Sequence, residues 1–327
     1  MISVIIVNFN SKDYLVKCVN SVLTSTIPVE VFVVDNGSED RSLSLLKETI
    51  HNESRVQIIE NKINTGFARA NNQAVPLTKG DYILFLNPDC IIKPDTLKNM
   101  MAVMDSHPEA GITGCLVRNP NGSEQAGSRR YIPTPFRSMI RVLKLSKFFH
   151  NSPELGVLNL HWQPLPDHPV PMEAISGAFM FVRRKAMKEV GPMDDEYFLH
   201  CEDLDWFMRF GIAGWKILFV PNVEIMHTKG MCSVDRQVRV EWYKHNGMIR
   251  FYRKFFRQQY PDGLMYSVVV AVWTRFALLT ILLSLKRLVK VLNEPPRSKL
   301  RGISRLVAAL KTKQASGNIT RRDLRRK

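Results

Sequence analysis

Short apolar runs alternate with segments of helical spacing over the first 118 residues, and this alternation most constrains the fold. The apolar runs, rich in β-branched and aromatic residues, are residues 3–8, 29–35, 56–60, 82–86 and 111–117. The segments with helical spacing are residues 14–23, 41–49, 67–75 and 96–104. Strands that alternate with helices of this length predict βαβ units, and therefore an α/β fold with a mainly parallel sheet and helices on both faces.

The fourth apolar run, YILFL, passes directly into Asn87, Pro88 and Asp89. A continuous apolar run is typical of a strand that is covered on both faces, and proline cannot donate to a strand ladder. We therefore expect the strand to end here. Ligands of open α/β sheets bind beyond the carboxyl ends of the strands, so Asp89 is a candidate binding residue. A solvated turn aspartate would give the same local pattern.

The turn after the first strand excludes two common nucleotide sites. It reads VNFNSKDY and carries no GxGxxG, and the chain contains no GxxxxGK[ST] motif. A dinucleotide-binding Rossmann site and a P-loop are therefore disfavoured. A bound diphosphate would instead be met by a divalent cation that carboxylates hold.

The positive charge is concentrated near the C-terminus. The formal net charge is +16, and residues 286–327 hold fourteen Lys or Arg against two acidic residues, a net charge of +12. This distribution favours a basic interaction tail over a basic catalytic groove.

Cysteine usage and the first residues favour a cytoplasmic compartment. The five cysteines are scattered without CxxC spacing, which favours reduced thiols over a zinc site: Cys18, Cys90, Cys115, Cys201 and Cys232. The segment MISVIIVNFN lacks the flank and cleavage site of a signal peptide, so we expect a first strand there.

Residues 264–285 form the longest apolar stretch. At ~1.5 Å per residue, a helix of this length could cross the ~30 Å hydrocarbon layer. Arg275 near its middle would cost about 2.5–3.5 kcal/mol in a simple span, so an interfacial or packed helix is also open, as is a buried helix of the globular domain. The basic tail beside it favours attachment to anionic lipid, at about 1 kcal/mol per basic residue.

Six motifs, in this order, resemble those of family 2 glycosyltransferases: SVIIVNFN, VFVVDNGSED, NTGFARANNQA, YILFLNPDC, SGAFMFVRR and FLHCEDLDWFMR. The resemblance covers about residues 1–227 and looks closest to bacterial rhamnosyltransferases of cell-surface polysaccharide synthesis. It implies the GT-A fold, with residues 1–118 as the nucleotide-sugar-binding half and residues 119–258 as the acceptor-binding and catalytic half. Residues 259–327 follow as a membrane-associating apolar helix and basic tail.

The resemblance implies six residues that bind the nucleotide sugar: Asn8, Asp35, Arg69, Asn72, Asn87 and Asp89. The carboxylate of Asp35 could accept hydrogen bonds from a base or ribose, or could instead cap the following helix. A guanidinium at position 69 suits bidentate phosphate contact, and Asn72 lies on the same helical face. Asn87 stands where the family usually has an aspartate, so one carboxylate is missing.

The resemblance also implies a metal ion, Mg²⁺ or Mn²⁺, with Asp89 and His227 as ligands. Imidazole suits Mn²⁺ more than Mg²⁺, which prefers oxygen. A single histidine is equally compatible with a structural role.

An inverting transfer needs a general base, and the HCEDLDW segment offers acids for it. By family position Asp203 is the catalytic base and Glu202 contacts the acceptor or orients the site. The same acids could simply favour a helix N-terminus. Ser176 and Gly177, small residues at a bend, would leave space for the sugar and acceptor.

The predicted function is an inverting hexosyltransferase that moves rhamnose or another hexose from a nucleotide-diphosphate donor to a lipid-linked or polysaccharide acceptor. We expect it at the cytoplasmic face of the inner membrane, peripheral or held by one helix, with residues 264–327 on the anionic surface and no specific nucleic acid. A sugar nucleotidyltransferase is one alternative, but such enzymes carry a Gly-rich basic loop where VNFNSKDY stands. A non-enzymatic, membrane-tethered basic protein is another; its tail would bind nucleic acid without sequence preference.

Overall fold

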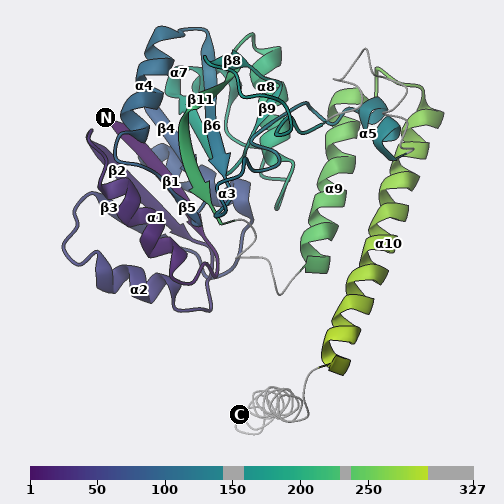
Figure 1. Cartoon of the computed structure of the whole chain (residues 1–327), viewed down its shortest axis with the longest axis horizontal. Helices are drawn as coiled ribbons and strands as arrows, with labels where there is room; N and C mark the ends of the chain where they lie inside the picture. The colour runs from purple at the N-terminus through teal and green to yellow at the C-terminus, as the bar shows by residue number, and fades with distance from the viewer. Residues whose placement is uncertain (143–157, 229–236, 294–327) are drawn as a thin grey trace, which may run out of the picture. The chain divides into compact units, whose positions relative to one another are not determined.

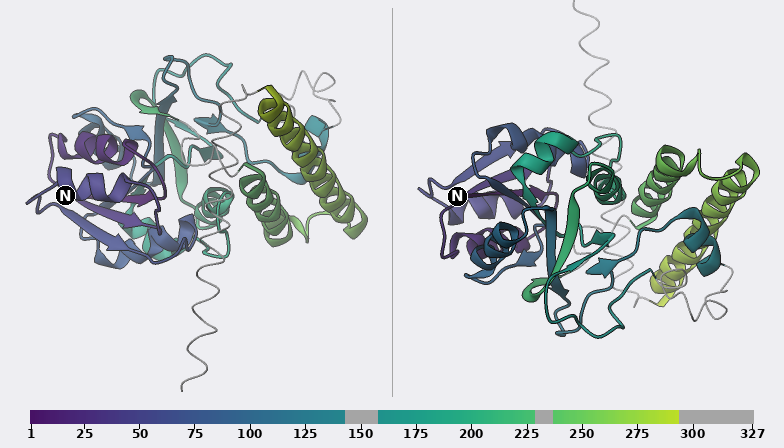
Figure 2. Two further views of the ribbon diagram at one scale, coloured as in Figure 1. Left: turned by 90° about the horizontal axis from the view of Figure 1, so that it is seen from below. Right: turned by 90° about the horizontal axis from the view of Figure 1, so that it is seen from above.

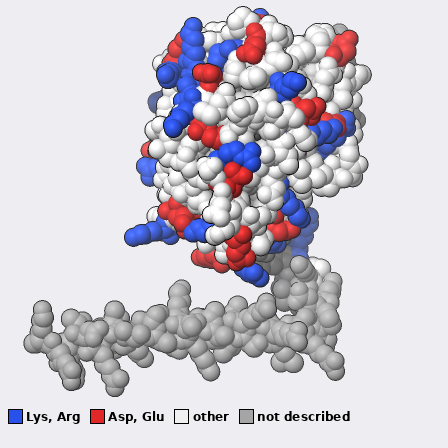
Figure 3. Space-filling model, turned by 90° about the vertical axis from the view of Figure 1, so that its left-hand side faces the viewer, with Lys and Arg blue, Asp and Glu red and all other residues white. Residues whose placement is uncertain are grey.

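The computed structural model describes residues 1–142, 158–228 and 237–293 of the 327-residue chain. The chain divides into two compact units, Met1–Trp273 and Thr274–Lys327. The first unit holds the α/β sheet (Figure 1). On the face drawn in Figure 3, basic and acidic side chains are interspersed, in keeping with the mild charge expected of this part of the chain.

The N-terminal part of the sheet is built from parallel strands. Its elements are β1 (Ile2–Asn8), α1 (Tyr14–Leu23), β2 (Val29–Asp35), α2 (Ser42–Thr49), β3 (Val56–Glu60), α3 (Phe67–Ala74), η1 (Val75–Leu77) and β4 (Tyr82–Leu86). Strand β1 pairs in parallel with both β2 and β4, and every residue of β1 and β4 is buried. The alternation therefore predicted these elements correctly, and the mixed α/β class is confirmed.

The second part of the unit adds strands in both directions. Its elements are β5 (Cys90–Ile91), α4 (Thr96–Ser106), β6 (Ala110–Arg118), β7 (Arg129–Arg130), α5 (Pro135–Val142), β8 (Val170–Pro171), β9 (Ala174–Ile175), β10 (Phe179–Arg183), α7 (Arg184–Val190), α8 (Glu202–Ile212), β11 (Lys216–His227) and α9 (Gln237–Phe256). The main sheet has the order β3-β2-β1-β4-β10-β6-β11-β5, with β8 on β11, while β7 and β9 form a separate pair. Strands β10, β5 and β8 run antiparallel to their neighbours.

Helices cover both faces of the main sheet, and each face has its own core (Figure 2). On one face, buried residues of α1, α2 and α4 pack against alternate residues of β1 and β2 such as Val4 and Val31. On the other face, buried residues of α3, α7 and α8 belong to one core cluster with Ile5 and Phe32, and α9 adds to this cluster through its contacts with α8. Burial on both faces explains why the strands read as unbroken apolar runs.

The apolar segment EAISGAFMFVRR does not form one continuous strand. It forms two strands in different sheets, β9 and β10, separated by residues 176–178. The Ser176 Oγ accepts a hydrogen bond from the Ala178 amide at 3.3 Å, and the Phe179 amide donates to the Ser176 carbonyl at 3.4 Å. These contacts turn the chain at the small residues, and the turn lies at the candidate site.

The C-terminal apolar stretch lies within α10 (Asp262–Asn293). By length and composition, Asp262–Lys286 could cross a membrane, with a mean hydropathy of 2.2 over its most apolar window. Only 6% of that window is buried, which argues against a core helix of a globular domain. The part of the predicted basic tail from residue 294 onward lies outside the described residues.

Candidate active site

The carboxyl ends of β1 and β2 hold a buried polar group around Asp35. Strand register places Asn8 beside Asp35, and the Asn8 Nδ2 donates to the Asp35 Oδ1 at 2.6 Å. The Asp35 Oδ2 accepts from the Ser38 amide at 3.0 Å. Helix α2 begins only at Ser42, so Asp35 closes a turn and does not cap that helix.

Asn8, on the strand next to Asp35, is enclosed by its neighbours. Its side chain is fully buried, and the Nδ2 also donates to Ser38 Oγ at 3.1 Å and Ser42 Oγ at 2.9 Å. Asn8 therefore positions Asp35, which is itself 3% exposed, and does not present its own amide to the surface.

Helix α3 begins against the segment that leads into α8. Gly66 has φ +93°, and a Cβ at this position would lie 2.8 Å from the Phe198 carbonyl oxygen. The Phe67 amide donates to that same oxygen at 2.8 Å. Only glycine fits this close approach without strain.

Arg69 and Asn72, expected to act on one ligand, have different partners. Arg69 is exposed, and its Nε lies 3.2 Å from the Asp195 Oδ2. The Asn72 side chain donates to the Met193 carbonyl at 2.8 Å and accepts from the Met193 amide at 3.2 Å. Asn72 therefore ties α3 to the segment before α8, while Arg69 lies where a ligand can reach it.

Asp89 and His227 lie together although the sequence separates them widely. After β4 ends, the Cys90 amide donates to the Asn87 carbonyl at 3.1 Å, and β5 then pairs with β11 so that Cys90 is opposite His227. The His227 Nε2 lies 3.1 Å from the Asp89 Oδ1, and each residue is 6% exposed. We refer to these two residues as the Asp89–His227 pair.

Gln125 sets the orientation of the His227 ring. Its Nε2 donates to the Asn119 Oδ1 at 2.9 Å and to the His227 carbonyl at 3.3 Å, so its Oε1 faces the His227 Nδ1 at 2.7 Å. An amide oxygen is an acceptor, and the Nδ1 therefore carries a proton. In the neutral ring, Nε2 then directs its lone pair toward the Asp89 carboxylate, an arrangement that a cation between the two groups stabilises.

The donor atoms of the Asp89–His227 pair fit a divalent cation. One imidazole nitrogen and one carboxylate oxygen form a set that suits Mn²⁺. The Cys90 Sγ is close as well, and all three potential ligand atoms lie within 4.8 Å of one another. Burial, followed by the charge of Asp89, raises the pKa of the Cys90 thiol well above its ordinary value, so the thiol stays protonated in this structure.

Residues 176–178 connect the Asp89 region to the N-terminus of α8. The Asn87 amide donates to the Ala178 carbonyl at 3.0 Å. A Cβ at the neighbouring Gly177 would lie 3.1 Å from the Asp203 Oδ2, so the lack of a side chain there makes room for this carboxylate. Asp89 and Asp203 therefore lie near the same short segment and the same end of β4.

Asp203 forms an ion pair with Arg130. The Arg130 Nη2 donates to the Asp203 Oδ2, and the two side chains are 24% and 13% exposed. The other oxygen, Oδ1, accepts from the Leu204 amide at 2.9 Å. Strand β7 supplies Arg130 and pairs with β9, which leads directly into residues 176–178.

Glu202 lies beside Asp203 but is more deeply buried. It is 6% exposed, and its Oε2 has no hydrogen-bond partner among the described residues. Burial, with a further contribution from the charge of Asp203, raises the pKa of Glu202 to about 8. Glu202 is therefore mostly protonated at pH 7. We call Arg130, Glu202 and Asp203 the Asp203 cluster.

Sequence reasoning missed two residues of this region, Gln125 and Arg130. Both fall within residues 119–258, the half that the resemblance assigned to acceptor binding and catalysis. Gln125 contacts a residue 102 positions away, and Arg130 contacts one 73 positions away. No local pattern marks either contact.

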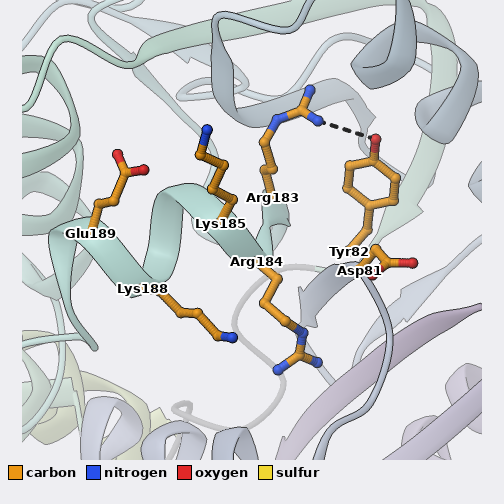
Figure 4. A pocket seen from close by; sticks show the side chains of 7 residues that line it. All are labelled: Asp81, Tyr82, Arg183, Arg184, Lys185, Lys188 and Glu189. Carbon is orange, nitrogen blue, oxygen red and sulfur yellow. Dashed lines mark hydrogen bonds between the residues drawn. The ribbon is translucent and has the colours of Figure 1, made fainter.

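A separate cavity of about 460 Å³ lies at the opposite end of β4, where Tyr82 begins the strand. Figure 4 shows its basic lining from α7 and the hydrogen bond from Arg183 to the Tyr82 hydroxyl. The Arg183 guanidinium also donates to the main-chain carbonyls of Ala110 at 3.0 Å and Met104 at 2.6 Å. These contacts hold Arg183 in a structural role.

The chain is similar in sequence to a known family and to named relatives. Residues 3–159 match the family described as Glycosyl transferase family 2. Over 277 residues the chain is 28% identical to the rhamnosyltransferase WbbL of Escherichia coli (strain K12), covering 81% of this chain and 92% of that protein. Over 241 residues it is 27% identical to N-acetylglucosaminyl-diphospho-decaprenol L-rhamnosyltransferase of Mycobacterium tuberculosis, covering 70% and 76% of the two chains.

Two solved structures share the fold. The mannosyltransferase PcManGT from Pyrobaculum calidifontis, in complex with GDP-Man and Mn²⁺, has a TM-score of 0.55 at 16% identity, covering 94% of this chain and 80% of that one. S. aureus TarS 1-349, in complex with UDP-GlcNAc, has a TM-score of 0.52 at 19% identity, covering 84% and 72%. Residues 3–159 therefore resemble family 2 glycosyltransferases, and the chain has the GT-A fold. Its sequence resembles rhamnosyltransferases.

Proposed function

We propose that this enzyme transfers rhamnose or another hexose, with inversion, from a nucleotide-diphosphate sugar to a lipid-linked acceptor in cell-surface glycan synthesis. The observation that carries the proposal is the placement of the Asp89–His227 pair and Asp203 near one short segment, residues 176–178. The names of the relatives support the sugar and the diphosphate-lipid acceptor.

Inverting transfer requires the acceptor hydroxyl to attack the anomeric carbon from the side opposite the departing diphosphate. Asp203, beside Gly177, would accept the hydroxyl proton on a carboxylate oxygen as the new glycosidic bond forms and the bond to the diphosphate breaks. Glu202 and Ser176 would contact the acceptor. On the donor side, Asp35 would bind the nucleoside, and Arg69, Asn87 and Asp89 would lie near the diphosphate.

The residues present fit Mg²⁺ or Mn²⁺, and Asp89 and His227 would hold it. When bound, a divalent cation neutralises the charge that develops on the departing diphosphate. The protonated Nδ1 of His227 and its Gln125 partner keep the Nε2 directed at Asp89, which is the contribution of this chain to that site.

The function is tested by transfer assays on the full chain with a panel of nucleotide sugars, with Mn²⁺, Mg²⁺ or EDTA and a lipid-diphosphate sugar acceptor. We expect one donor to give a glycosylated product whose anomeric configuration, read by NMR, is opposite to that of the donor. Retention of configuration, or equal transfer in EDTA, would contradict the inverting or the metal-dependent part of the proposal.

We also propose that the enzyme works at the cytoplasmic face of the membrane, attached through residues 264–327. The exposed apolar window of α10 and the net charge of +12 beyond it support this proposal. Flotation of the full chain with anionic and neutral vesicles tests it. A chain that ends at Trp273 keeps Met265 and Val268, which are buried in the first unit, and serves as the comparison. Equal recovery of both chains with vesicles would contradict membrane attachment.

A further inference from the structure

Arg130 forms an ion pair with the candidate base, Asp203, in this structure. Its guanidinium pairs with the Asp203 Oδ2, while the Oδ1 receives the Leu204 amide, so both oxygens that could take the acceptor proton already have a partner. An acceptor hydroxyl that approaches Asp203 therefore competes with Arg130.

The Asp203 cluster also contains two buried polar atoms without partners among the described residues. These are the Arg130 Nε and the Glu202 Oε2. Burying a polar atom without a hydrogen bond is costly, and native proteins rarely do so without a reason. Glu202 is 6% exposed and lies next to Asp203 in the chain. Its unpartnered Oε2 is therefore part of the candidate site and not of the outer surface.

The position of Arg130 lets its side chain move while its main chain stays fixed. Strand β7 pairs Arg130 with Ala174, and the same residue bridges to Asn159. Its side chain is 24% exposed, so an incoming ligand can reach the guanidinium. The fork of the guanidinium matches a phosphate, which can accept from two of its N–H groups at once.

We propose that Arg130 is an acceptor-binding residue that moves from Asp203 to a phosphate of the acceptor diphosphate, and thereby frees the base only when the acceptor is bound. This inference rests on the proposed function, because it takes a sugar-diphosphate-lipid as the acceptor. In such a molecule the diphosphate is one sugar ring away from the reacting hydroxyl, so a side chain that starts at Asp203 can contact it. The Arg130 Nε, which is buried without a partner among the residues that the structure describes, gains an acceptor in the exchange.

Steady-state kinetics of the full chain with two acceptors test the proposal. One acceptor is an N-acetylglucosaminyl-diphosphate-undecyl lipid, and the other is the undecyl glycoside of the same sugar without the diphosphate. For Arg130→Gln we expect KM for the diphosphate acceptor to rise about tenfold or more, with KM for the donor unchanged and kcat/KM for the neutral glycoside equal to or above that of wild type. Arg130→Lys keeps the positive charge but not the forked guanidinium, so its KM for the diphosphate acceptor should lie between those of wild type and Arg130→Gln. Arg55→Gln removes an exposed arginine that pairs with Glu53 and should behave as wild type.

Binding provides a readout that does not depend on turnover. Calorimetry with undecyl diphosphate in EDTA should show affinity for wild type and for Arg55→Gln, and about tenfold weaker affinity for Arg130→Gln. Thermal unfolding of each variant identifies any loss of folding, in which case Arg130→Lys carries the comparison.

Three outcomes would overturn the proposal. An equal loss of kcat/KM on both acceptors would show that Arg130 only positions Asp203. A raised KM for the donor would show that Arg130 binds the donor diphosphate. Unchanged kinetics would show that Arg130 does not act in the site. A wild-type protein that binds undecyl diphosphate through Arg130 but transfers to neither acceptor would instead contradict the proposed function, and would leave Arg130 as an anion-binding residue.

Discussion

The Asp89–His227 pair and the Asp203 cluster lie near the same short segment, yet they differ in how their polar atoms are satisfied. In the pair, a ring of fixed orientation faces a carboxylate, with Gln125 held by its own hydrogen bonds behind it. In the cluster, the ion pair of Arg130 and Asp203 lies beside two buried atoms that have no hydrogen-bond partner among the described residues. The donor atoms of the pair fit a cation, whereas the unpartnered atoms of the cluster fit the acceptor that we propose for Arg130.

The largest expected effect comes from changing the proposed base of the cluster, Asp203. Asp203→Asn should lower the transfer rate by about 10²–10⁴-fold, the range that a general base contributes, because the amide cannot take the proton. Nucleotide binding should change less than about twofold, since the pair is untouched. Transfer assays and calorimetry with the nucleotide measure the two effects.

Glu196→Gln is the matched control for this change. Glu196 is 71% exposed and precedes α8, so its loss should leave the transfer rate unchanged. If Asp203→Asn retains a rate near that of wild type, Asp203 is not the base.

The next effect tests the pair. His227→Ala and Asp89→Ala should each weaken Mn²⁺-dependent binding of the nucleotide by at least about tenfold, and the double variant should be little worse than either single one, because the two residues act on one cation. Gln125→Leu should weaken the same Mn²⁺-dependent binding about tenfold, because the His227 ring loses the hydrogen bond that orients it. Calorimetry with and without Mn²⁺ provides the measurement.

His51→Ala, which changes an exposed histidine elsewhere in the fold, is the control for the pair and should bind as wild type. Fully additive losses in the double variant, or losses of equal size in EDTA, would show that the pair does not act through a shared metal.

The smallest effect concerns Glu202 and pH. Because its pKa is raised to about 8 in the folded state, Glu202 stabilises the fold most below its unfolded pKa, and this contribution decreases as pH rises toward and through about 8. The unfolding temperature of wild type should therefore decrease more between pH 6 and pH 9 than that of Glu202→Gln, which cannot ionise. We expect a difference of about 2 °C or more.

Glu196→Gln should keep the wild-type pH dependence of unfolding, since this side chain is exposed. Identical pH dependence in wild type and Glu202→Gln would show that Glu202 is not buried as a neutral acid, and would weaken the distinction between the pair and the cluster.

The parts of the site that were predictable are those where the chemistry follows directly from a strand or helix end. Asp89 was placed at the end of β4 because a buried run stops at a proline, and that placement follows from covalent geometry and hydrogen-bonding capacity. Glu202 and Asp203 were placed in an acidic segment that begins α8. The partners of Asn8 were not predictable, because residue type at a strand end does not show which neighbours its amide will bind.

The sequence by itself determined the order of the strands and helices in the first half and the residue types at the ends of the strands, because these depend on periodicity and on the limits of proline and glycine. Only the tertiary structure decided that His227 faces Asp89, that Gln125 orients its ring, and that Arg130 holds Asp203. Those contacts arise from the antiparallel pairing of β5 with β11 and of β7 with β9. Such pairings bring together residues that are far apart in the sequence, and they depend on the stability of the whole sheet. No short stretch of sequence therefore encodes them.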